Sequence, residues 1–290
     1  RIRIPMATSS VQAAPGQQPD MTVLATLTPE ALAACLTREL RDATQEDAAI
    51  PERDAAVAIF RRYLGRYQAD VRNRFERYEL KGAAAAKMIA SFTDVMLRAI
   101  VDLAMRATEL VGPASPAGGL SGFSMAATGG YGRGLLAPFS DIDLLFLIAD
   151  DAGERVHPLI EYILYFLWDL GVKVGHATRT VNECITEAAA DTTVRTALLY
   201  ARLLAGDTAL FAMFEARYIL ACVEAGVGGF IQDKRRERLE RPRRFGHSPD
   251  LVEPNNQDGR AGLPDLQTLY WLRRHTCSTR PVQHLPAPSA

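Results

Sequence analysis

The sequence has few cysteines, almost no net charge and no long apolar run. Its four cysteines, Cys35, Cys184, Cys222 and Cys277, form no CxxC pair and no His/Cys cluster. A zinc site and a disulfide framework are therefore not expected. We expect the cysteines to be reduced thiols in a cytoplasmic protein. No apolar run reaches the ~18 residues that a bilayer-spanning helix needs. The basic start, residues 1–5, lacks the apolar stretch of a signal peptide.

The balance of charge and hydropathy narrows the class of protein. A formal net charge of −1 argues against DNA, RNA or an anionic membrane as the main partner. The apolar fraction of 48% is ordinary for a globular protein. A chain of 290 residues is long enough for two modest domains or one large one.

The chain changes character along its length, and the changes predict five regions. Serine, glutamine, alanine and proline dominate the start, whereas proline and a loss of apolar periodicity mark the end. The predicted fold class is α+β, a small mixed sheet flanked by N- and C-terminal helical regions. The regions are a disordered start (1–21), a helical region (22–111), a core (120–205), a helical region (206–275) and a disordered tail (276–290).

Helical signals fill the first hundred residues. Thr28 can cap a helix that has Pro29 in its first turn. Apolar residues at three-to-four spacing predict a second helix over 52–79 and a third over 83–110.

The middle of the chain mixes strand and helix signals. The apolar run Ile142–Ile148 is typical of a buried strand, and weaker strands are predicted at 123–128 and 172–180. Helices are predicted at 156–170 and 182–204, and mostly helix, broken by prolines, at 208–271.

Two carboxylates stand at the start of the strongest strand. Residues two apart on a strand face the same side, so Asp141 and Asp143 project together. Their like charges repel, and each is costly to desolvate without a cation. Oxygen ligands suit Mg²⁺, and a pair of such ions can activate a hydroxyl and stabilise a leaving pyrophosphate. The pair is therefore the predicted metal site and catalytic centre.

A glycine-rich segment precedes the carboxylates. Gly129 and Gly130 follow a strand, and ten residues separate Gly130 from Asp141. Glycines allow a triphosphate to approach the backbone closely, and Arg133 adds a planar donor fork suited to phosphate, with Ser140 in support. Each feature alone is more often a turn, a surface cation or a solvated carboxylate, but the combination is restrictive.

The segment 129–145 resembles the signature of bacterial PII uridylyltransferases, within the DNA-polymerase-β-like nucleotidyltransferase superfamily. Segments 168–180 and 251–267 are similar to further family blocks, so the resemblance covers roughly residues 80 to 271. It implies a polymerase-β-like mixed sheet and Mg²⁺-dependent transfer of UMP from UTP to a tyrosine hydroxyl of the PII signalling protein, with release of pyrophosphate.

The chain departs from the family pattern in several places. Leu135 stands where the family usually has glutamate, and Pro264 removes an N–H that a phosphate could use. The family also carries a metal-dependent hydrolase domain and small-molecule-sensing domains after this part. A truncated homologue or fragment is therefore expected, one that transfers uridylyl groups without removing them.

Several residues and two alternative functions remain open. Asp169 and Asp265 are candidates for a third carboxylate, whereas His176 is more often a structural histidine. The basic run 234–244 is usually a solvated helix face. One alternative is a nucleotidyltransferase with another base or acceptor, and the other is an inactive fragment that only binds a partner or nucleotide.

Overall fold

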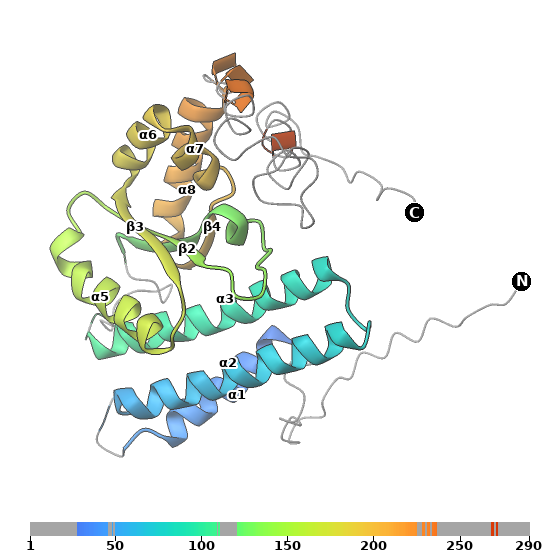
Figure 1. Cartoon of the computed structure of the whole chain (residues 1–290). Coiled ribbons are helices and arrows are strands. Elements are labelled where there is room, and N and C mark those ends of the chain that lie inside the picture. Colours follow the sequence, from blue (N-terminus) through green and yellow to red (C-terminus); the bar gives the residue numbers. More distant parts are fainter. Residues whose placement is uncertain are drawn as a thin grey trace, which may run out of the picture. The chain divides into compact units, whose positions relative to one another are not determined.

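A computed structural model describes the central part of the chain, which divides into two compact units with the boundary between Ala99 and Ile100. Helix α3 (Gly82–Ala107) runs through the boundary between them. Figure 1 shows the helices and strands of both units. The structure describes residues 28–45, 48, 50–108, 110, 121–224, 228–229, 231–232, 234–236, 268–269 and 271.

The first unit begins with helices α1 (Pro29–Asp42) and α2 (Arg53–Glu76). The side chain of Thr28 accepts a hydrogen bond from the Ala31 N–H at 3.3 Å, and proline occupies the first helical position. Such a cap satisfies one of the donors that a helix start leaves unpaired. The predicted first helix and its cap are confirmed.

Two tyrosines of α2 hold this unit together. The Tyr63 hydroxyl donates to the Glu39 carboxylate of α1 at 2.9 Å. The Tyr67 hydroxyl donates to the Met88 carbonyl of α3 at 2.7 Å, and its ring stacks on Phe92 with centroids 3.9 Å apart. The apolar stripe that predicted the second helix is therefore a packing surface toward both neighbouring helices.

A four-stranded mixed sheet lies at the centre of the second unit. Its strands are β1 (Phe123–Ala127), β2 (Ile142–Ile148), β3 (Val174–Thr180) and β4 (Arg202–Gly206), in the order β3-β2-β1-β4. β2 and β3 are parallel and joined through helix α5 (Gly153–Asp169), whereas β1 is antiparallel to β2 and β4. The three predicted strands and the mixed sheet are confirmed.

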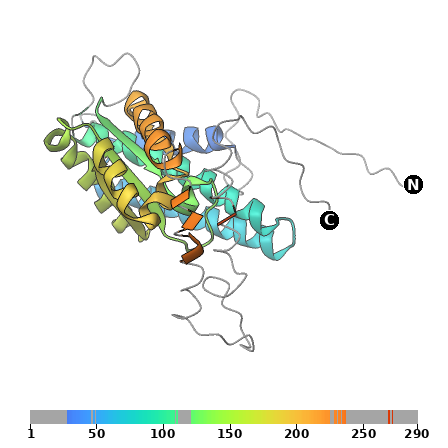
Figure 2. The same cartoon turned by 90° about the horizontal axis from the view of Figure 1, so that it is seen from above.

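Helices cover both faces of the sheet. α6 (Val181–Ala190), α7 (Thr192–Leu198) and α8 (Thr208–Tyr218) lie over one face, where they pack against Leu145 and Leu147 of β2 (Figures 1 and 2). α5 lies on the opposite face (Figure 1). Because strand side chains alternate between faces, β2 is buried from both sides and reads as a nearly continuous apolar run.

The helix predicted over 182–204 is wrong in two respects. It is interrupted at Asp191, whose side chain accepts a hydrogen bond from the Thr193 N–H at 2.6 Å and starts α7. The segment from Arg202 to Gly206 then leaves helix and pairs with β1 as β4. Pairing with a buried strand outweighs a local helical preference, which is a weak determinant on its own.

Beyond α8 the chain continues as a short π-helical segment, η2 (Ile219–Glu224). The predicted disordered ends, 1–21 and 276–290, lie outside the described residues, and so does most of the predicted helical region after η2. Among the residues that the structure describes, none of the helices has the length and apolar character required to traverse a bilayer.

Candidate active site

The two predicted catalytic carboxylates lie at one end of β2. Asp143 is the second residue of β2, and Asp141 is the residue just before the strand begins. Both side chains are exposed. Alternation along the strand places Asp143 on the same face as Leu145, the face covered by α6, α7 and α8. Although the side chain is exposed, the protein atoms around its carboxylate partly desolvate it, and this raises the pKa of Asp143 above its ordinary value; the negative charge of Asp141 raises it further. The pair therefore favours a cation.

The Asp143 carboxylate lies between two glycines. A Cβ atom on Gly129 would lie 2.8 Å from Oδ2 of Asp143, and one on Gly175 would lie 2.7 Å from Oδ1. Gly129 follows β1 and Gly175 belongs to β3, so the two glycines come from the strands on either side of β2. Only residues without a side chain leave room for the carboxylate in this position.

The glycine-rich segment forms a single helical turn, α4 (Gly129–Gly132), directly after β1. The Gly132 N–H donates to the Thr128 carbonyl at 2.8 Å, and the Gly134 N–H donates to the Tyr131 carbonyl at 2.9 Å. These bonds fold the chain back so that it can enter β2 beside the strand that it has just left.

Three of the four glycines in this segment are required by the fold. Gly129 and Gly134 have φ of 58° and 71°, a left-handed conformation that favours glycine. A side chain on Gly132 would collide with the carbonyl oxygen of Tyr200. Gly130 is different, because a Cβ there would make only ordinary contacts, 3.6 Å from Nη2 of Arg133. The fold therefore does not explain why position 130 has no side chain.

The two other predicted nucleotide-binding residues flank the site. Arg133 ends α4, and its guanidinium lies over the Tyr200 ring, 5.7 Å from the centroid, close to Gly130. The Ser140 hydroxyl is exposed and donates to the Asp141 carbonyl at 3.3 Å. A glycine backbone and a guanidinium side by side form a surface suited to phosphate oxygens.

His176 and Asp169 lie on the other side of the sheet. His176 pairs in register with Leu144, so its side chain points to the face opposite that of Asp143. There its ring makes edge-on contacts with Phe146 and Trp168, with both centroid distances 6.4 Å. Asp169 is the last residue of α5, which covers the same face. This geometry favours the structural interpretation of His176.

Other predicted features are only partly visible. Asp265 and Pro264 lie outside the described residues, as does the basic run beyond its helical piece 234–236. Leu135, which stands where a carboxylate was expected, is partly exposed after α4. Within the described part of the chain no group of three His, Cys, Asp or Glu side chains is placed to hold a metal. A third carboxylate ligand is therefore not identified there.

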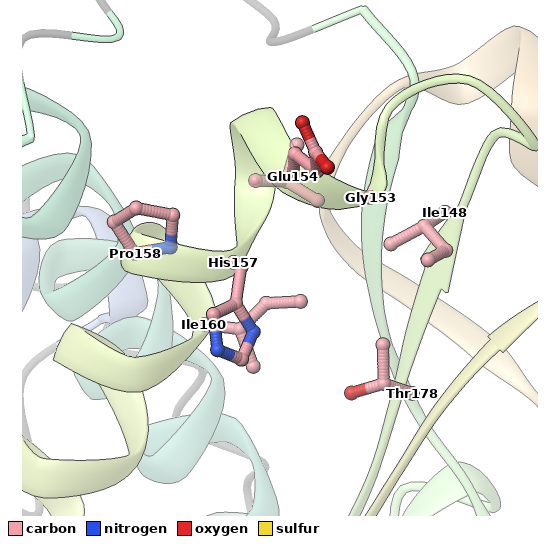
Figure 3. Close-up of a pocket in the computed structure, with 8 residues that line it drawn as sticks. Ile148, Gly153, Glu154, His157, Pro158, Ile160 and Thr178 are labelled. Atoms are coloured by element: carbon pink, nitrogen blue, oxygen red, sulfur yellow. The ribbon is translucent and has the colours of Figure 1, made fainter.

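The hollow in Figure 3 is separate from this site. Ile148 and Thr178 of the strands face His157 and Ile160 of α5 across a space of about 480 Å³. Ile148 is at the opposite end of β2 from Asp143, ~16 Å along the strand at ~3.3 Å per residue. The lining of this hollow is largely apolar, so the hollow does not resemble a triphosphate site.

The carboxylate pair is compatible with Mg²⁺. This ion is commonly held by one or two carboxylates together with substrate phosphates, and it does not need an all-protein cage. Asp141 and Asp143 would supply the oxygen ligands. Desolvation and the negative charge of Asp141 both raise the pKa of Asp143, and a cation would offset both effects. Two protein carboxylates beside a phosphate-binding surface are therefore a sufficient donor set for a metal–nucleotide complex.

Comparison with known proteins agrees with this geometry. Residues 118–204, which include β1, the glycine turn, β2 and β3, match the nucleotidyltransferase domain family. The chain contains a nucleotidyltransferase domain. The enzyme class and the α+β fold expected from the sequence are thereby confirmed.

Similarity to individual proteins extends beyond the nucleotidyltransferase domain. The chain is 44% identical over 227 residues to a bifunctional uridylyltransferase/uridylyl-removing enzyme of Gluconobacter oxydans, covering 77% of this chain and 23% of that protein. Proteins of the same name from Azospirillum brasilense and Rhodopseudomonas palustris are 42% and 40% identical, covering 80% and 83% of this chain and 24% and 25% of theirs. The chain thus spans about a quarter of these relatives. The resemblance drawn from the motifs is confirmed.

Gly175 was not among the candidate residues selected from the sequence. A glycine within a predicted strand, directly before His176, is a signal of close approach by another group. The group could not be identified without the register, which sets Gly175 beside Asp143.

Proposed function

We propose that the nucleotidyltransferase domain transfers UMP from UTP to a tyrosine hydroxyl of a PII-type signalling protein and releases pyrophosphate, with Mg²⁺ as the cofactor. The observation that carries the proposal is the carboxylate pair Asp141 and Asp143 beside a turn whose Gly130 has no structural reason to lack a side chain. The uridylyl group is proposed because the similar proteins are named uridylyltransferases. The PII acceptor is proposed because segment 129–145 resembles the signature of PII uridylyltransferases.

In this proposal the glycine turn binds the triphosphate. The phosphates lie over the backbone of Gly130, and the Arg133 guanidinium donates to their oxygens. Asp141 and Asp143 hold the cation, which neutralises charge on the phosphates and on the attacking oxygen. Binding and orientation supply most of the catalysis, as in other phosphoryl-group transfers.

The chemical step exchanges one phosphorus–oxygen bond for another. The acceptor's phenolic oxygen forms a bond to the α-phosphorus, and the bond from that phosphorus to the bridging oxygen of pyrophosphate breaks. The phenolic proton is released to solvent. Exposure of both carboxylates leaves this end of β2 open to a protein acceptor.

The cytoplasm is the proposed location. The described cysteines, Cys35, Cys184 and Cys222, are free and buried thiols, as expected in a reducing compartment.

The base and the acceptor are tested by a competition assay. The chain is incubated with Mg²⁺, a PII protein and α-labelled UTP, with and without excess unlabelled ATP. Label on a PII tyrosine that ATP does not suppress is the expected result. Transfer from α-labelled ATP instead, or label on a small molecule but not on PII, would assign a different base or acceptor to the same site.

A further inference from the structure

Asp143 occupies the middle of a row of three residues that crosses the sheet. On one side the parallel register pairs it with Gly175 of β3. On the other side the Thr128 N–H donates to the Asp143 carbonyl at 3.0 Å, and Gly129 follows directly. Register partners project to the same face and lie within contact distance, so a side chain at position 175 would meet the carboxylate. A Cβ atom on Gly129 would meet it as well, from the other side.

The two glycines have different local requirements. Gly129 has φ of 58°, so its backbone already favours glycine. Gly175 lies in a strand outside the left-handed region, and any residue can adopt its backbone conformation. Glycine normally weakens a strand interior because it adds entropy to the unfolded chain and packs nothing. The close approach of the Asp143 carboxylate therefore explains the glycine at position 175.

The space left for the carboxylate is narrow. Cβ atoms at the two positions would lie 2.7 Å and 2.8 Å from its two oxygens, well inside the ~3.5–4.0 Å optimum for non-bonded atoms. In the wild-type chain neither atom is present, so the carboxylate fits between the two positions. In Gly175→Ala it could keep its observed orientation only by meeting the new methyl group.

We propose that Gly175 is a positioning residue, and that Gly129 and Gly175, because they lack side chains, leave a slot in which the Asp143 carboxylate takes its observed orientation. The slot itself follows from the fold. Its consequence, that the orientation is the one used to hold the metal–nucleotide complex, rests on the proposed function. Gly175 does not touch the substrate in this account and acts only through Asp143.

The slot is tested first in metal-free protein by a double-mutant cycle in urea. Gly175→Ala is made in the wild-type chain and in Asp143→Ala, which removes the carboxylate. In the wild-type background, Gly175→Ala should lower the urea concentration at the unfolding midpoint. In the Asp143→Ala background, the same substitution should leave this midpoint unchanged or raise it. Equal changes in both backgrounds would mean that position 175 does not sense the carboxylate, and this result overturns the slot.

The consequence is tested by Mn²⁺ binding, measured by electron paramagnetic resonance in the presence of a non-hydrolysable UTP analogue. Gly175→Ala should weaken Mn²⁺ binding at least tenfold. Gly153→Ala is the matched control, because its Cβ would lie 3.9 Å from Ile148 Cδ1, an ordinary contact. Unchanged Mn²⁺ affinity in Gly175→Ala refutes the positioning role and leaves the proposed function intact. If the wild-type chain itself binds no Mn²⁺, the proposed metal site fails, whereas the urea cycle still decides the slot.

Discussion

Gly130→Ala separates nucleotide binding from folding at the glycine turn. The new methyl group would lie 3.6 Å from Nη2 of Arg133 and 4.0 Å from the Leu135 carbonyl oxygen, so the folded chain accommodates it. Alanine is favoured over glycine within a helical turn, so the free energy of unfolding should be unchanged or higher by up to about 1 kcal/mol. The substitution therefore changes the surface of the turn without breaking it.

The same methyl group should obstruct a triphosphate that rests on the backbone. Overpacking of a close contact costs roughly 1–3 kcal/mol, which corresponds to binding about 5–150-fold weaker. Gly130→Val should weaken binding further because its side chain is larger and branched.

The assay is calorimetric titration with a non-hydrolysable UTP analogue and Mg²⁺, together with thermal unfolding of each variant. Gly153→Ala serves as the control for an added methyl group elsewhere in the domain. Wild-type affinity in Gly130→Ala and Gly130→Val would refute the phosphate-binding role of the turn. A large loss of thermal stability in Gly130→Ala would show that the fold, after all, requires this glycine.

Two further predictions concern stability. Asp207→Ala should lower the free energy of unfolding by about 1–2 kcal/mol, because its carboxylate accepts the backbone N–H groups of Gly122, Ala209 and Leu210 at 2.9–3.0 Å. Burial alone would raise the pKa of Asp207, but these bonds lower it. The stabilisation is therefore present above about pH 4 and is lost as pH falls further, through the lowered pKa of the folded state. The gap between the urea curves of wild type and variant should narrow as pH falls below 4, and a constant gap would contradict this. Tyr78→Gly should raise the free energy of unfolding by about 1 kcal/mol, since Tyr78 has φ of 59° at the end of α2; an unchanged or lower melting temperature would count against backbone strain there.

Sequence patterns predicted β2 well because its signal is local. Seven consecutive residues, six of them apolar, identify a strand buried from both faces, and the predicted and observed bounds agree. The same holds for α1, where Thr28 and Pro29 give a specific start. In both elements the residues that determine the structure are close together in the sequence.

The features that escaped prediction depend on pairing between distant segments. β4 is five residues long, includes a charged Arg202 and is defined by its register with β1. Likewise, Gly175 is 32 positions after Asp143 and becomes its neighbour only when β2 and β3 align. The alternation rule predicted that the two carboxylates would share a face, but it gave no information about the neighbouring strands.

The proposed active site is tested by comparing transfer rates of the wild-type chain, Asp143→Asn and Asp150→Asn with Mg²⁺, α-labelled UTP and a PII protein. Asp143→Asn removes the negative charge from the proposed metal site, whereas Asp150→Asn makes the same change at an exposed carboxylate just beyond the other end of β2. We expect labelled PII from the wild type and from Asp150→Asn, and a transfer rate lower by about 100-fold or more in Asp143→Asn, with all three chains folded by circular dichroism. Transfer by Asp143→Asn at the wild-type rate, or none by the folded wild-type chain, would contradict the proposed active site.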